Sequence, residues 1–258
     1  MHPATPQDLA KKVNECGLSN IQLALNPLIQ LKIWRDVQDV LKDAGITILS
    51  GMLEATGEDY TSLKTIAQTG GVRSDETWPT TWENAKRVAT IASDLGLTLV
   101  TFHAGFLPSE ACGERTKMIE RLSDVVLVFA DQGVAIAFET GQENATNLIT
   151  VLEEIDHSTL GVNFDPANMI LYSQGDPIEA VQALRPWIKQ VHIKDAKHTE
   201  VEGTWGSEVA AGTGDFCWKT FLELVPPETD LVIEREGGET RIADVKQAFA
   251  MLKGLGAC

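Results

Sequence analysis

The sequence predicts an α/β fold in which parallel strands alternate with helices around one closed sheet. Short apolar runs alternate with amphipathic stretches from end to end, and runs that are apolar throughout belong to strands covered by helices on both faces. The length of 258 residues is the third observation, because a barrel of eight βα units takes about 250 residues. We therefore expect a single-domain (β/α)₈ TIM barrel over residues 1–258.

The elements follow one another in a regular order. Seven apolar runs predict strands at 21–25, 46–53, 97–105, 134–140, 160–166, 188–196 and 231–236. Eight amphipathic stretches predict helices at 8–17, 33–45, 82–96, 114–133, 145–155, 177–187, 217–225 and 241–254. In the second of these, Ile33, Val37, Val40 and Leu41 share one face and Gly45 ends the helix.

Two segments depart from this regular order. The polar stretch 54–81 predicts a long βα loop with a helical turn at 61–68. The chain begins almost directly with a helix, so the first barrel strand is expected to be short, irregular or missing.

Composition narrows the class of protein. The formal net charge of −16 would repel phosphate backbones, so no nucleic-acid partner is expected. No run approaches the about 18 apolar residues of a membrane span, and the N-terminus has no secretory pattern. The four cysteines (Cys16, Cys112, Cys217 and Cys258) are far apart and predict no disulfide framework. A cytoplasmic protein without a membrane partner is expected.

Metal-competent side chains lie at the ends of five consecutive predicted strands. They are His103, Glu139, Asp165, His192 and Glu234. A single such residue is more often a helix cap or a core histidine, but the ends of parallel barrel strands converge on one face, which carries the active site. Oxygen ligands with imidazole predict one divalent cation, with Mn, Mg, Co and Zn left open. The last four residues form the narrower ligand set.

Six motifs in order resemble a known family. They are "FHAGF", "FETGQEN", "GVNFDPANM", "VHIKDA", "GTGDF" and "VIEREGG". Together they resemble the xylose isomerase-like TIM barrels, specifically the sugar phosphate isomerase/epimerase group. The resemblance implies one divalent metal held by Glu139, Asp165, His192 and Glu234, and leaves a homodimer open. In the related family-2 apurinic endonucleases a histidine stands where this chain has Asn168, so the resemblance does not extend to a trinuclear nuclease site.

Two departures from the family pattern bear on substrate choice. Ketose 3-epimerases of the family carry an arginine six residues after the metal histidine, where this chain has His198. The sequence "KDA" after the histidine resembles the broader isomerase, dehydratase and keto-sugar branches.

The ligand set suggests a reaction. A cation that stabilises negative charge on a substrate oxygen makes the proton on the adjacent carbon removable. Glu139 and Glu234 would flank the substrate and act as acid and base as well as metal ligands, through an enediolate. The expected function is a divalent-metal-dependent isomerase or epimerase of a keto- or aldo-sugar, or of a sugar derivative. A dehydratase of a keto-sugar or cyclitol, and a non-catalytic sugar-binding barrel, remain alternatives.

Four further residues are expected at the substrate. His103 would donate to a hydroxyl or lie next to the metal, and Asn168 would bind through its amide. Lys194 faces the same side of its strand as His192, and would bind either a substrate oxygen or a ligand carboxylate. Trp205 would form an apolar wall or pack within its loop.

Overall fold

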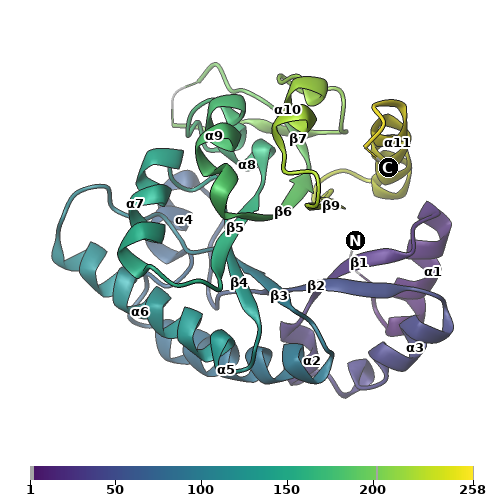
Figure 1. Cartoon of the computed structure of the whole chain (residues 1–258), viewed down its shortest axis with the longest axis horizontal. Coiled ribbons are helices and arrows are strands. Elements are labelled where there is room, and N and C mark those ends of the chain that lie inside the picture. The colour runs from purple at the N-terminus through teal and green to yellow at the C-terminus, as the bar shows by residue number, and fades with distance from the viewer. Residues whose placement is uncertain (1–2, 202, 258) are drawn as a thin grey trace.

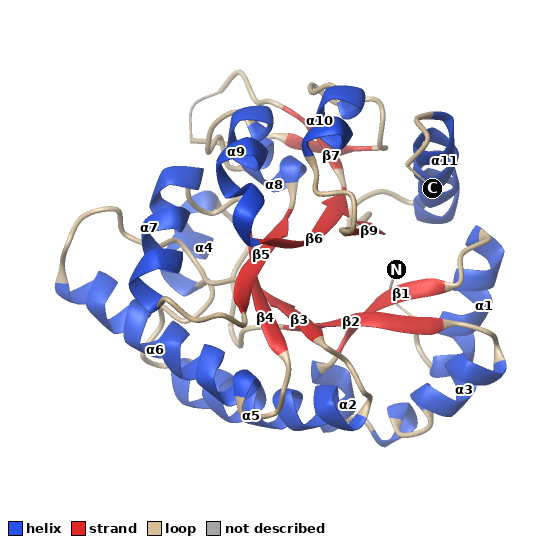
Figure 2. Cartoon of the chain, in the orientation of Figure 1, coloured by secondary structure: helices blue, strands red, loops and turns tan. Residues whose placement is uncertain are grey.

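The core is a parallel sheet that curves around a central axis, with helices on the outside (Figures 1 and 2). The computed structural model describes residues 3–201 and 203–257. In this part of the chain the sheet has seven strands in the order β1-β2-β3-β4-β5-β6-β9, and every neighbouring pair is parallel. The strands are β1 (Asn20–Ala24), β2 (Thr47–Leu53), β3 (Leu99–Phe102), β4 (Ala135–Glu139), β5 (Leu160–Phe164), β6 (Ile188–Ile193) and β9 (Asp230–Ile233).

Helices connect successive strands and cover the outer face of the sheet. They are α1 (Pro6–Cys16), α2 (Asn26–Gln30), α3 (Val37–Asp43), α4 (Leu63–Thr69), α5 (Trp78–Asp94), α6 (Gly113–Ala130), α7 (Ala145–Ile155), α8 (Pro166–Leu171), α9 (Pro177–Leu184), α10 (Trp218–Leu224) and α11 (Arg241–Gly254). In α7 the Asn144 side chain caps the first turn by accepting from the Asn147 amide at 2.9 Å. The same helix buries Leu148 and Val151 against the sheet.

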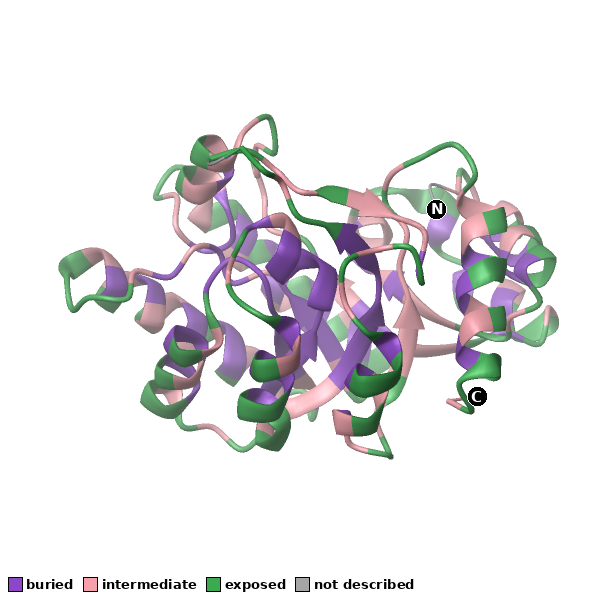
Figure 3. Cartoon of the chain, turned by 90° about the horizontal axis from the view of Figure 1, so that it is seen from above, coloured by how far each residue is buried: buried purple, intermediate pink, exposed green. Residues whose placement is uncertain are grey.

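The middle strands are the most deeply buried part of the molecule (Figure 3). Phe102, Phe138 and Phe164 lie on three successive strands and are fully buried. All seven strands that the apolar runs predicted are present, and so is the helix within the long loop 54–81, as α4. Within residues 3–201 and 203–257 the barrel lacks a regular first strand, as expected.

The sheet is open between β1 and β9, which are its two edge strands. A cavity of about 1240 Å³ lies between them, lined by Val13 of α1, Ile21 of β1, Leu231 of β9 and Phe249 of α11. On the outside, α1 and α11 contact each other. The opening therefore interrupts the hydrogen-bonded sheet, while α1 and α11 pack together outside it.

Several element boundaries differ from the predictions. The helix expected at 33–45 is a 3₁₀ turn (Lys32–Trp34) followed by α3. The placement of Ile33 on the buried face is wrong, because the 3₁₀ turn buries Trp34 and leaves Ile33 55% exposed. The helix expected from residue 82 begins one turn earlier at Trp78, with Pro79 in its first turn, where proline is tolerated. The short helices α2 and α8 were not predicted.

The strand expected at 188–196 is also divided. β6 ends at Ile193, and β7 (Asp195–Lys197) then pairs with β8 (Ser207–Val209) in an antiparallel hairpin. The strand is interrupted at Asp195, whose carboxylate accepts hydrogen bonds from the backbone N–H groups of Gly212 and Gly214 in the loop after the hairpin.

The remaining general expectations concern cysteines and membranes. Cys16, Cys112 and Cys217 carry free thiols, and Cys258 lies outside the described residues. Among the described residues, no helix is both long enough and apolar enough to cross a bilayer.

Candidate metal centre

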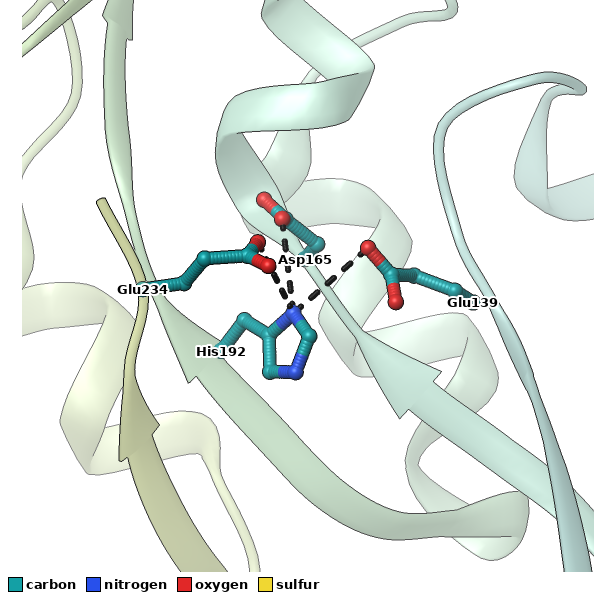
Figure 4. Close-up of side chains that lie close together, drawn as sticks. All are labelled: Glu139, Asp165, His192 and Glu234. Atoms are coloured by element: carbon teal, nitrogen blue, oxygen red, sulfur yellow. Dashed lines mark ion pairs between the residues drawn. The ribbon is translucent and has the colours of Figure 1, made fainter. Parts of the chain in front are cut away.

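Four side chains from four strands meet at the carboxyl end of the sheet (Figure 4). Glu139 is the last residue of β4, Asp165 directly follows β5, His192 lies in β6 and Glu234 directly follows β9. One ligand atom from each lies within 4.8 Å of the others. The strand-end pattern thus predicted a real juxtaposition.

The imidazole of His192 is oriented from both sides. Its Nδ1 lies 3.2 Å from Glu234 Oε2, 3.5 Å from Glu139 Oε1 and 3.6 Å from Asp165 Oδ2. Its Nε2 lies 2.9 Å from the amide oxygen of Gln22, to which a hydrogen on Nε2 would donate, and 3.1 Å from the Nδ2 of Asn163. Nδ1 therefore faces the three carboxylates, in the position of a metal ligand once its proton is displaced.

A layer of amide side chains supports Glu139, and it explains why a carboxylate ends an apolar strand. Asn163 donates to Glu139 Oε2 at 3.0 Å, and Asn168 donates to Glu139 Oε1 at 2.9 Å. Behind them, Gln190 donates to Asn163 Oδ1 at 3.2 Å, and Ser50 Oγ donates to Gln190 Oε1 at 2.6 Å. Every one of these groups is buried, so the hydrogen bonds compensate for the lost hydration of the charge.

The supporting residues Gln22, Asn163 and Gln190 were missed at the sequence level, although a signal was present. Asn163 stands two residues before Asp165, and Gln190 stands two residues before His192. Side chains alternate along a strand, so each of these two shares a face with the ligand that follows it. A polar residue two positions before a ligand, in an otherwise apolar strand, indicates such a support.

Asp165 has a double role. Its Oδ1 accepts from the backbone N–H of Asn168 at 3.0 Å and caps α8. Its Oδ2 has no hydrogen-bond partner among the described residues. Gly141 (φ 130°) allows this packing, because a Cβ there would lie 2.2 Å from the Cβ of Asn168. Asn168 therefore reaches Glu139 only because residue 141 has no side chain.

Lys194 lies against the ligand carboxylates. Its buried ammonium is 3.1 Å from Glu234 Oε2, 3.6 Å from Asp165 Oδ2 and 3.3 Å from Glu236 Oε1. It also donates to Asn168 Oδ1 at 3.2 Å. Of the two expected contacts, the structure contains the ion pairs with carboxylates.

The charges of the cluster shift one another. Burial lowers the pKa of His192, but the carboxylates of Glu234 and Glu139 outweigh it and hold the pKa well above its ordinary value. Burial raises the pKa of Glu234, yet the ammonium of Lys194 and the imidazole of His192 bring it well below its usual range. The pKa of Asp165 is raised by burial, despite Lys194. The three carboxylates together thus carry more negative charge than the ammonium of Lys194 can neutralise.

The two remaining expected substrate residues lie on loops around this centre. His103 Nε2 is 3.4 Å from Glu139 Oε1, and its buried Nδ1 has no hydrogen-bond partner in the described chain. Trp205 packs edge-on against Tyr172, with ring centroids 5.0 Å apart. Tyr172 is 8% exposed and also meets Phe106 edge-on at 5.5 Å.

The loop after β4 buries two further polar side chains. Both amide atoms of Gln142 and the Oε1 of Glu143 lack hydrogen-bond partners among the described residues. Gln142 lies beside the hydroxyl of Tyr172. Burial alone raises the pKa of Glu143 to about 8, so this carboxyl is largely protonated at neutral pH.

The loop after β8 is held by Asp195. Its Oδ2 accepts from the amides of Gly212 (2.8 Å) and Gly214 (3.0 Å) and from Trp218 Nε1 (2.9 Å). A Cβ at Gly214 would lie 1.7 Å from Asp195 Oδ1. Asp195 thereby orders the chain between the hairpin and α10.

The donor set fits a divalent cation. Hard cations take carboxylate oxygens at about 2.0–2.6 Å, so ligands on opposite sides of one ion lie about 4–5 Å apart, which matches the 4.8 Å limit of the cluster. The Oδ2 of Asp165, which has no hydrogen bond within the described chain, offers one acceptor, and His192 directs its Nδ1 toward the carboxylates.

Comparison with known proteins identifies the family to which this fold belongs. A model of the xylose isomerase-like TIM barrel family matches residues 10–255. A xylose isomerase domain protein from Planctomyces limnophilus is 30% identical, with a TM-score of 0.86 over 95% of this chain and 90% of that one. A xylose isomerase-like TIM barrel protein from Mycobacterium smegmatis, solved in complex with magnesium, is 19% identical, with a TM-score of 0.74 over 98% and 90% of the two chains.

A curated relative matches over a shorter stretch. The 3-dehydroshikimate dehydratase of Bacillus anthracis is 31% identical over 86 residues, which are 32% of this chain. The match spans only 30% of the length of that dehydratase. The family model and the Planctomyces limnophilus protein, by contrast, cover nearly the whole chain, and they show that it belongs to the xylose isomerase-like TIM barrel family.

Proposed function

We propose that this protein is a divalent-metal-dependent isomerase or epimerase of a keto- or aldo-sugar or a sugar derivative. The observation that carries the proposal is the meeting of Glu139, Asp165, His192 and Glu234 within 4.8 Å. These four residues would hold the ion. Once bound, the cation supplies Lewis-acid stabilisation of negative charge on a substrate oxygen. The magnesium in the Mycobacterium smegmatis relative supports a hard divalent ion.

The proton transfers would be made by Glu139 and Glu234. The two side chains reach the centre from opposite sides of His192, on β4 and β9 (Figure 4). One carboxylate takes the proton from the carbon next to the carbonyl, and its return to the neighbouring carbon isomerises the sugar. Return from the opposite face by the other carboxylate epimerises it.

The electrostatics favour carboxylates that are ionised at neutral pH. Burial raises the pKa of Glu139, but His103 and His192 outweigh this effect and lower it below its ordinary value. The amides of Asn163 and Asn168 fix its two oxygens. His103 would donate a hydrogen bond to a substrate hydroxyl, and Lys194 would hold Glu234 in place.

A dehydratase is the second candidate, favoured by the 31% identity to the 3-dehydroshikimate dehydratase. The first step would be the same abstraction of a proton beside a carbonyl. A β-hydroxyl would then leave instead of the proton returning. The two reactions therefore differ in whether the proton returns to carbon or the β-hydroxyl leaves.

Incubation in D₂O with Mn²⁺ and a panel of keto- and aldo-sugars tests the proposal. NMR and mass spectrometry should show solvent deuterium on the carbon next to the carbonyl, without loss of water. Loss of the β-hydroxyl would instead identify the dehydratase. Glu139→Gln should abolish exchange, whereas Glu153→Gln, on the exposed face of α7, should not. Absence of both reactions on every substrate would contradict the proposal and favour a non-catalytic barrel.

A further inference from the structure

The four side chains of the metal centre differ in how the sheet supports them. Glu139, Asp165 and His192 lie in or directly after β4, β5 and β6, and each of these strands pairs with a strand on both sides. Glu234 follows β9, which pairs only with β6 and has its other edge on the open side of the sheet (Figure 1). Its side chain is 20% exposed, whereas those of the other three are at most 2% exposed. The sheet therefore holds Glu234 from one side only.

The turn after Glu234 is held by a carboxylate from the β7–β8 hairpin. Glu208 Oε1 accepts from the backbone N–H of Glu236 at 2.9 Å, and Glu208 Oε2 accepts from the backbone N–H of Gly237 at 2.7 Å. The Nη1 of Arg235 lies 2.8 Å from the same Oε1. Successive backbone N–H groups form a concavity that binds anions, and here the bound anion is the side chain of Glu208. The turn is thus attached to β8 through three contacts with one carboxylate.

These contacts are largely shielded from water and continue to the last helix. The side chains of Glu208 and Arg235 are 12% and 13% exposed. Arg235 Nε donates to Asp244 Oδ2 at 2.8 Å, in the first turn of α11. Gly237 fits closely, since a Cβ there would lie 3.0 Å from Glu208 Oε2. Hydrogen bonds to an ionised group are stronger than neutral ones, and more so where water is largely excluded, so this carboxylate fixes the turn.

The hairpin that carries Glu208 begins at the metal centre itself. β7 starts directly after Lys194, whose ammonium is 3.1 Å from Glu234 Oε2. Glu208 of β8 pairs with Ala196 of β7, and Asp195 fixes the loop that follows the hairpin. Glu208 therefore extends from an ordered element of the centre toward the ligand that the sheet supports least.

We infer that Glu208 is a positioning residue for the metal ligand Glu234. On the open side of β9 its carboxylate supplies the support that a neighbouring strand gives to the other ligands. The inference rests on the proposed function, because it concerns the same metal centre. Without this carboxylate the turn is free to move and Glu234 moves with it, while the other three ligands keep their places. Contacts that orient a metal ligand are worth about 10–100-fold in metal affinity.

Calorimetric titration of the whole chain and of Glu208→Gln with Mn²⁺ tests the inference. The glutamine presents its NH₂ group to one of the two backbone N–H groups, which then loses its acceptor. We expect the affinity for Mn²⁺ to fall about tenfold. Glu200→Gln removes the same charge from an exposed position between β7 and β8 and should leave the affinity within about twofold. A purely electrostatic weakening would shrink between about 0.05 M and 0.5 M KCl, whereas the loss of positioning persists.

Hydrogen exchange of the metal-free protein gives a readout that does not involve the ion. The backbone N–H groups of Glu236 and Gly237 should be protected in the wild type and exchange at least about tenfold faster in Glu208→Gln, while exchange within β5 stays unchanged. If Glu208→Gln does not fold, Gly237→Ala tests the same contact, because its Cβ crowds Glu208 Oε2 without a change of charge. It should weaken Mn²⁺ binding and speed this exchange in the same direction.

The outcomes separate this inference from the proposed function. If the wild type binds Mn²⁺ and Glu208→Gln binds it equally well, or if the weakening vanishes at high salt or is matched by Glu200→Gln, only the positioning role is overturned. Faster exchange at Glu236 and Gly237 without weaker Mn²⁺ binding also overturns it, since the turn would then move without Glu234. A wild-type protein that binds no Mn²⁺ overturns the proposed function, and with it the inference.

Discussion

Glu143 offers a quantitative test of how the loop after β4 is packed. Its side chain is 6% exposed, and burial alone raises its pKa to about 8 from an ordinary value of 4.5. The unfolded chain therefore releases this proton near pH 4.5, while the folded protein keeps it until about pH 8. The stabilisation is fully present below pH 4.5 and is lost as the pH rises toward 8.

The magnitude follows from proton linkage. Within this window each pH unit reduces the free energy of unfolding by about 1.4 kcal/mol through Glu143. From pH 5.0 to 7.5 the loss is about 3 kcal/mol. Glu143→Gln has no proton to release, so its free energy of unfolding lacks this decrease. The other titrating groups are shared by both proteins and cancel in the difference.

Urea denaturation at pH 5.0, 6.0, 7.0 and 7.5 measures this difference directly. The free energy of unfolding of Glu143→Gln, minus that of the wild type, should rise by about 3 kcal/mol over the series. Glu153→Gln removes an exposed carboxylate and should give a nearly constant difference. A constant difference for Glu143→Gln as well would refute the reasoning, since Glu143 would then ionise at an ordinary pKa in the folded state.

Three further predictions concern the centre and the core. The raised pKa of His192 keeps this side chain protonated above pH 6.5, so Mn²⁺ must displace a proton to bind it. Calorimetry should therefore show that the affinity for Mn²⁺ falls by up to tenfold for each pH unit of acidification. An affinity that does not change with pH would exclude His192 as a ligand. Gln22→Leu removes the acceptor of the His192 Nε2 hydrogen and should weaken Mn²⁺ binding about 10–100-fold with little change in melting temperature. Phe138→Ala, at a fully buried strand position, should cost about 3–5 kcal/mol in urea denaturation, and a loss below 1 kcal/mol would contradict the packing.

The strands and the meeting of four strand-end side chains were predictable because their signals are local. An apolar run ending in one polar residue, as at Glu139 and Asp165, is visible without knowledge of the fold. Barrel topology then brings such ends together. The same reasoning left the first barrel strand unassigned, and among the described residues the sheet is open at that position, between β9 and β1.

The support of the centre was not predictable in the same way. Ser50 and Gln190 are 140 residues apart in sequence, so no local pattern connects them. The hairpin of β7 and β8 has strands of three residues each, too short for a periodic signal. Its position depends on Asp195, whose partners Gly212 and Gly214 follow after a long loop.

The most direct test of the central claim is anomalous scattering from crystals grown with Mn²⁺. The account predicts one strong manganese peak coordinated by Glu139, Asp165, His192 and Glu234, and its disappearance in Asp165→Asn. A manganese-saturated crystal with no peak among these four side chains, or with its main peak elsewhere, would contradict the account.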